Sequence, residues 1–182
     1  MTIDMTRHQG DTGLPVIECT DTRRQVYRVR TDFQPYNHED GTDGTEKQGM
    51  TFIETEFPYK PTMAEVRDFC LGVIDQQTAQ AILSGLEWQG KRVWLSIENQ
   101  LNFAAAERRA LANADLLPMD VKIGETDSGE SIRHTFQNQE ALTLFVTACQ
   151  EHIEQCRQAG QQRKDGFDFT EYAEALGIAT EE

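Results

Sequence analysis

The chain has 182 residues, of which 38% are hydrophobic and 26% are charged, and its formal net charge is −14 at pH 7. That length gives room for one domain with a hydrophobic core, or for a compact domain with a small attachment. The acidic balance argues against nucleic acid as a partner, because phosphate binding rests on Lys and Arg, and no apolar run approaches the roughly 18 residues that a membrane span needs.

The N-terminal end, residues 1–23, is polar and rich in Thr, Asp and Arg, with one apolar island at residues 14–17. We expect a flexible arm there, because chain ends that bury few side chains are poorly ordered. The first residues also lack the hydrophobic stretch of a signal peptide, which predicts that the protein stays in the cytoplasm of the producing cell.

Two segments with alternating apolar and polar residues follow, at residues 27–33 and 50–57. This period of two is typical of half-buried strands, and it places Arg28, Arg30 and Asp32 on the solvent face of the first strand. The turn formers and charges of residues 37–49 predict a solvated loop, because their acidic residues do not have the spacing of an EF-hand. We expect residues 24–60 to form a β-hairpin attachment.

The main α+β domain is expected over residues 61–179. Thr62 and Glu65 have the spacing of a capping box, and an apolar stripe continues the predicted helix. That stripe contains Met63, Val66, Phe69, Cys70, Val73 and Ile74. Gln89-Gly90 then predicts a tight hairpin, because Gly supplies the positive φ of a two-residue turn.

The stretch VWLSIENQLNF, residues 93–103, passes from a strand to a helix and is unusually rich in amides. Ser96 is the expected N-cap, and Asn99 and Gln100 fall in the first turn, where backbone groups need partners. Ile97, Leu101, Ala104, Ala105 and Leu111 supply the apolar stripe that we expect to face the core. The amide-rich stretch is therefore interpreted first as a structural joint.

The C-terminal third predicts a hairpin over residues 119–136 and then the longest helix of the chain, capped by Asn138. The helix stripe contains Leu142, Phe145, Cys149, Ile153 and Cys156. It fades after Cys156, so the last turns should extend into solvent or fray. A short helix within residues 167–178 should fold back. The predicted fold is α+β, with short antiparallel hairpins packed on two or three amphipathic helices and a long helix near the C-terminus.

No enzyme motif is present, so no catalytic residue is assigned and no cofactor is expected. Cys149, His152 and Cys156 share one face of the predicted helix and could offer two thiolates and an imidazole to Zn²⁺. A fourth ligand is missing unless His134 reaches across. Cysteine is among the most buried residue types, which favours core thiols over a metal site. The four cysteines contain no CxxC pair and should be reduced.

A ligand site is the other possibility at the amide-rich stretch. Trp88 and Trp94 could form an aromatic platform for a small ligand or a glycan, with Asn99, Gln100 and Asn102 as hydrogen-bonding partners. Aromatic side chains on short strands beside a helix more often belong to a core. The core interpretation is preferred for the tryptophans.

From about Tyr27 to Leu176 the chain resembles a family of phage and prophage proteins of unknown function that are often encoded near tail genes. The resemblance rests on three blocks: VWLSIENQLNF, IRHTF and RKDGFDFTEY. It implies a context and no reaction. The leading hypothesis is a virion or tail-assembly protein that acts through protein contacts, with phage tail components or a second copy as partners. The alternatives are a ligand- or glycan-binding domain and an enzyme of unrecognised class.

Overall fold

The computed structural model describes residues 3–39 and 46–178 and has the α+β fold that the sequence predicts. All strand pairs are antiparallel, and the longest helix, α3 (Gln139–Asp165), lies near the C-terminus. The described residues form two compact units, one from residues 3–39, 46–75 and 164–178 and one from residues 76–163. No helix in these ranges is long and apolar enough to cross a membrane.

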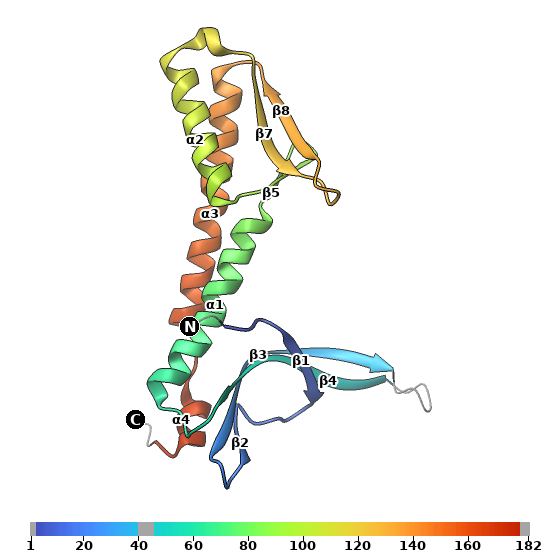
Figure 1. The fold of residues 1–182 in the computed structure, drawn as a ribbon, viewed down its shortest axis with the longest axis vertical. Coiled ribbons are helices and arrows are strands. Elements are labelled where there is room, and N and C mark those ends of the chain that lie inside the picture. The colour runs from blue at the N-terminus through green and yellow to red at the C-terminus, as the bar shows by residue number, and fades with distance from the viewer. Residues whose placement is uncertain (1–2, 40–45, 179–182) are drawn as a thin grey trace. The chain divides into compact units, whose positions relative to one another are not determined.

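The first unit contains a four-stranded sheet (Figure 1). Its strands are β1 (Arg7–Asp11), β2 (Ile17–Asp21), β3 (Val26–Glu39) and β4 (Glu46–Phe57), in the order β1-β4-β3-β2. The first half of α1 (Met63–Ser84) and the short helix α4 (Thr170–Leu176) pack on the same core. Tyr172 of α4 donates a hydrogen bond to Arg30 O at 2.8 Å.

The N-terminal residues differ from the flexible arm that the sequence suggests. Residues 7–11 and 17–21 are strands, because the apolar island supplies Val16 and Ile17, which are 6% and 8% exposed in the core of the first unit. The strands at residues 24–60 share this core with α1 and α4 and do not form a separate attachment.

The expected loop at residues 37–49 is shorter than predicted. Residues 37–39 extend β3 and residues 46–49 begin β4, where Asn37 pairs with Gln48 and Tyr36 with Gly49. Cross-strand pairing therefore continues into a segment whose composition indicated only turns. The centre of the predicted loop, residues 40–45, lies outside the described residues.

Arg30 departs from the solvent position that strand alternation predicts. It is 4% exposed, and its guanidinium contacts Glu18 Oε2 at 2.6 Å, Glu54 Oε2 at 3.1 Å and Pro15 O at 3.1 Å. The charge is tolerated because two carboxylates and a carbonyl replace its hydration. Arg28, two residues earlier, keeps a side chain that is 42% exposed.

The second unit has two hairpins beside α2 and α3 (Figure 1). Its other elements are β5 (Leu86–Trp88), β6 (Lys91–Val93), α2 (Ile97–Ala112), a 3₁₀ turn (Ala114–Leu116), β7 (Met119–Glu125) and β8 (Ser131–Phe136). Phe145 of α3 contacts both α2 and β8: its ring centroid is 4.9 Å from that of Phe103 and 5.1 Å from that of Phe136.

The predicted turn and cap residues are confirmed. Thr62 Oγ1 accepts from Glu65 N at 3.3 Å, and the Glu65 carboxylate accepts from Thr62 N at 2.8 Å, as a capping box requires. Gln89 and Gly90 both have positive φ, 49° and 74°, between β5 and β6. Asn138 Oδ1 accepts from Ala141 N at 2.8 Å and caps α3.

The end of α3 does not fray as the fading stripe suggested. The helix continues to Asp165, and Gly160 is buried against Thr78, whose Oγ1 would lie 2.3 Å from a Cβ at position 160. Contact with α1 here uses a small residue instead of an apolar stripe, which explains why the hydrophobic pattern did not predict it.

The apolar stripe of α2 is the largest error in the predicted packing. The core face consists of Asn99, Phe103, Ala106 and Ala110. Ile97, Leu101 and Leu111, which we expected in the core, are 76%, 67% and 56% exposed. We call these three residues the outward stripe. The helix has apolar residues on two opposite faces, and its large aliphatic side chains lie on the exposed one, whereas the core face has Phe103 and two alanines.

We predict that Arg30→Ala lowers the free energy of unfolding by about 3 kcal/mol, because it leaves the largely buried Glu54 carboxylate short of its closest partner. Arg28→Ala is the matched control, with an expected loss below about 1 kcal/mol, because Arg28 is 42% exposed and lies farther from Glu54, at 3.8 Å, than Arg30 does. Urea denaturation of both variants measures the difference. Equal shifts in the two midpoints would contradict the role assigned to Arg30.

Candidate functional site

The amide-rich stretch forms the joint between β6 and α2. Ser96 Oγ accepts from Asn99 N at 3.2 Å and is the N-cap, as predicted. The side chains of Asn99 and Gln100 donate to Trp94 O at 2.8 Å and Leu95 O at 2.7 Å. They satisfy the last carbonyls before the helix, whereas we had expected them to serve the helix N-terminus itself.

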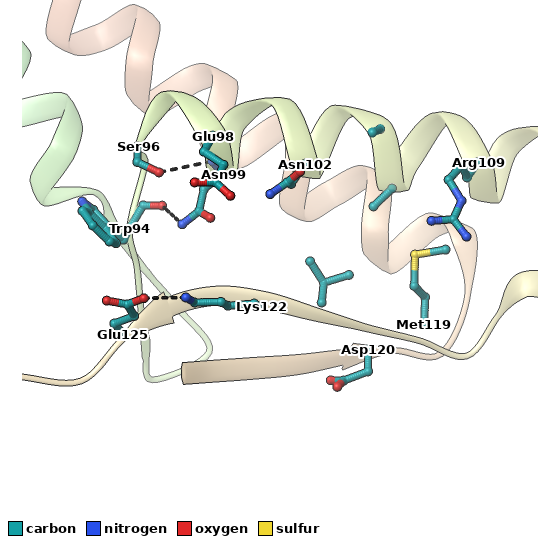
Figure 2. A pocket seen from close by; sticks show the side chains of 13 residues that line it. Trp94, Ser96, Glu98, Asn99, Asn102, Arg109, Met119, Asp120, Lys122 and Glu125 are labelled. Carbon is teal, nitrogen blue, oxygen red and sulfur yellow. Dashed lines mark hydrogen bonds and ion pairs between the residues drawn. The ribbon is translucent and has the colours of Figure 1, made fainter. Parts of the chain in front are cut away.

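An open groove of about 500 Å³ runs between α2 and β7 (Figure 2). Its helix wall contains Glu98, Asn102, Ala105, Ala106 and Arg109, and its strand wall contains Met119, Asp120, Val121, Lys122 and Glu125. Trp94, which is 42% exposed, lies at the end near Glu125. The walls are polar at their rims and small or aliphatic on the floor.

The charges along the groove are divided between paired and unpaired groups. Lys122 Nζ lies 2.5 Å from Glu125 Oε1, and Asp120 is paired with Arg133 of β8. In the described part of the chain, neither Glu98 nor Arg109 has an ion-pair partner. Arg109 follows Glu98 by eleven positions along the helix, or about 16 Å at 1.5 Å per residue. The groove therefore has a free carboxylate near one end and a free guanidinium near the other.

Three of the predicted ligand-binding residues meet at this groove: Trp94, Asn99 and Asn102. Gln100 does not line it. Trp88 packs in the core of the second unit, where its ring is 5.5 Å from that of Phe145, so the two tryptophans do not form one platform.

Sequence reasoning missed Glu98, Arg109 and Lys122 as groove residues. Glu98, Asn102 and Arg109 are spaced by four and seven residues, a polar stripe that could have been found on α2. The far end of β7, at Glu125, is more than twenty residues beyond Asn102 in the sequence. Nothing in the sequence therefore shows that β7 lies opposite that stripe.

The proposed metal ligands lie along α3 without forming a metal site. Cys149 is buried, and burial raises the pKa of its thiol to about 12, so the thiol stays protonated at neutral pH. Cys156 Sγ lies 3.6 Å from His152 Nε2, which is also 3.4 Å from Ala81 O. Within residues 3–39 and 46–178, no group of three or more His, Cys, Asp or Glu residues is placed to hold a metal ion.

A comparison of the chain with protein-family models, with curated proteins and with solved structures finds no match.

We predict that Ser96→Ala lowers the free energy of unfolding by about 0.5–2 kcal/mol, through the loss of the N-cap of α2. Ser131→Ala, on the exposed start of β8, should leave the stability unchanged. Thermal and urea midpoints measure both variants. An unchanged midpoint for Ser96→Ala would show that the cap contributes nothing to the joint.

We also predict that purified protein contains substoichiometric zinc and that a chelator leaves its melting temperature unchanged. The reason is that a structural metal couples its binding to folding, whereas a protonated Cys149 thiol is no ligand. Metal analysis and thermal melts with and without EDTA test this. One tightly held zinc per chain, lost in Cys149→Ser, would contradict it.

Proposed function

We propose that the protein acts by binding other proteins, without catalysis, as a phage- or prophage-derived virion or tail-assembly component. The phage setting rests on the resemblance of the three sequence blocks given above. The binding role rests on one observation, the outward stripe of α2. Aliphatic side chains of this size that gather on one exposed helix face are typical of interaction sites.

The spacing of the outward stripe suits a helical partner. Ile97, Leu101, Ala104, Arg108 and Leu111 follow one another by four, three, four and three residues. This is the seam spacing of helices that pack side by side. Covering a Leu or Ile side chain completely contributes about 1.5–3 kcal/mol, so the three exposed aliphatic residues can supply much of a moderate affinity.

The apolar stripe of α3 is not available for binding other proteins. Leu142, Phe145, Cys149 and Ile153 are each at most 9% exposed and belong to the core of the second unit. The helix has no apolar surface left along those four positions. The proposal therefore assigns association to α2.

We predict that Leu101→Glu weakens association, because it places a charge in the middle of the outward stripe. Leu144→Glu is the matched control, since Leu144 is a similarly exposed leucine, 57% exposed, on α3. Light scattering across a concentration series measures self-association of wild type and both variants. Pull-downs with proteins encoded beside the gene, using the same three baits, measure association with other chains.

The expected result is that Leu101→Glu loses at least one complex that wild type and Leu144→Glu both form. A wild-type protein that is monomeric at all concentrations and captures none of its encoded neighbours would contradict the proposal. Turnover of a small molecule by such a monomer would favour the enzyme hypothesis instead.

A further inference from the structure

The groove between α2 and β7 follows the edge of a strand. Its strand wall includes four consecutive residues, from Met119 to Lys122. Successive side chains of a strand point to opposite faces, so one face would contribute only alternate residues. A wall of consecutive residues indicates that the groove runs along the backbone edge of β7.

On the side away from β8, a backbone group hydrogen-bonds to β7 only near its C-terminal end, among the described residues. The part of that edge beside the groove has no such backbone partner among those residues. β7 pairs with β8 along one side. On the other side, Ile123 O accepts from Trp94 N at 2.9 Å, which is the one backbone bond that β7 makes outside its hairpin among the described residues. Gly124 permits this approach, because a Cβ there would lie 2.6 Å from Arg92 O. Residues 92–94 thus lie against the end of the edge through one hydrogen bond, and they meet β7 in the reverse sequence order, with Arg92 at Gly124 and Trp94 at Ile123.

The joint then takes the chain off this edge. After Trp94 the chain turns at Ser96 into α2, and the Asn99 and Gln100 amides hold the carbonyls of residues 94 and 95. The groove lies beyond this turn, along the part of β7 from Met119 to Lys122. An uncovered strand edge is a template for pairing with another chain.

We propose that the groove binds an extended peptide segment of another protein, which adds to β7 as an antiparallel strand. Main-chain hydrogen bonds to an exposed edge supply affinity in such complexes, and flanking pockets supply specificity. The antiparallel direction is the order in which Arg92 and Trp94 meet Gly124 and Ile123. Four residues of β7 edge correspond to about 13 Å of strand, which a peptide of roughly four or five residues covers.

The charges of the groove fix the chemistry of the peptide. An antiparallel peptide begins near Trp94 and Glu98 and ends near Arg109 and Met119. The free Glu98 carboxylate favours a basic residue near the start of the peptide. The Arg109 guanidinium favours an acidic side chain or a terminal carboxylate at its end. Small side chains at Ala105 and Ala106 leave space above the floor.

This site is separate from the outward stripe, and each can fail without the other. Counting about 100° per residue on α2, the groove residues lie roughly a quarter to a third of a turn away from the stripe. Leu101→Ala, which shortens the stripe without placing a new charge beside Glu98 and Ala105, should therefore leave peptide binding unchanged. Ala105→Trp should fill the groove, and Ala112→Trp is its control, because Ala112 is also exposed on α2 but does not line the groove.

A library of random heptapeptides displayed on particles is panned on the wild-type protein, with Ala105→Trp as the counter-selection target. The best peptide is made with a fluorescent label, and its Kd is measured by anisotropy. We expect enriched peptides with a basic start and an acidic end. Binding should weaken about tenfold or more in Ala105→Trp and in Arg109→Glu and stay unchanged in Ala112→Trp. Thermal midpoints confirm that each variant is folded.

Backbone methylation of the same peptide tests strand addition directly. Methyl groups on one alternate set of peptide nitrogens should abolish binding, and methyl groups on the other set should not, because a strand bonds through every second residue. The proposal is overturned if no peptide is enriched against the counter-selection. It is also overturned if neither methylated peptide loses affinity, or if Ala105→Trp abolishes binding of neutral oligosaccharides instead.

Discussion

The second unit depends on the way the chain leaves β6. Two amides, from Asn99 and Gln100, hold the carbonyls of Trp94 and Leu95, while Ser96 caps the helix that follows. A strand that ends in a buried environment must find partners for its last polar groups, because an unmade hydrogen bond there costs about 1–3 kcal/mol. The amides supply those partners at the point of the turn. The direction in which α2 starts is thereby set, and so are the faces that it presents to the core, to β7 and to solvent.

The three faces of α2 differ in chemistry because they differ in what they meet. Phe103, Ala106 and Ala110 face the core and pack beside α3 and β7, where small residues allow close approach. The groove face has polar and charged side chains of moderate length, and the outward stripe has large aliphatic ones. A helix of sixteen residues needs only the first face to fold. The polar side chains of the groove face and the aliphatic side chains of the outward stripe are not needed for folding. That is the reason to assign these two faces to binding.

Local rules predicted the elements, their caps and their turns well. The capping box at Thr62, the hairpin at Gln89-Gly90 and the caps at Ser96 and Asn138 depend on residues within four positions of one another, which the sequence displays directly. The errors concern partners that are distant in sequence. Arg30 is buried because Glu18 and Glu54 lie on the neighbouring strands, and the core face of α2 was misjudged because Ile97 and Leu101 outweigh Phe103 in a hydrophobic pattern.

The candidate site could be predicted only in part, because some of its residues are distant from one another in the sequence. Trp94, Asn99 and Asn102 were found because they are close together in the sequence, but a groove has two walls, and β7 supplies the second from beyond the next turn. Once both walls are known, the amide-rich stretch has two roles that need not be alternatives. It ends a strand and starts a helix, and by removing the chain from the β7 edge it leaves that edge open. The proposed peptide binding uses the edge that the joint leaves open.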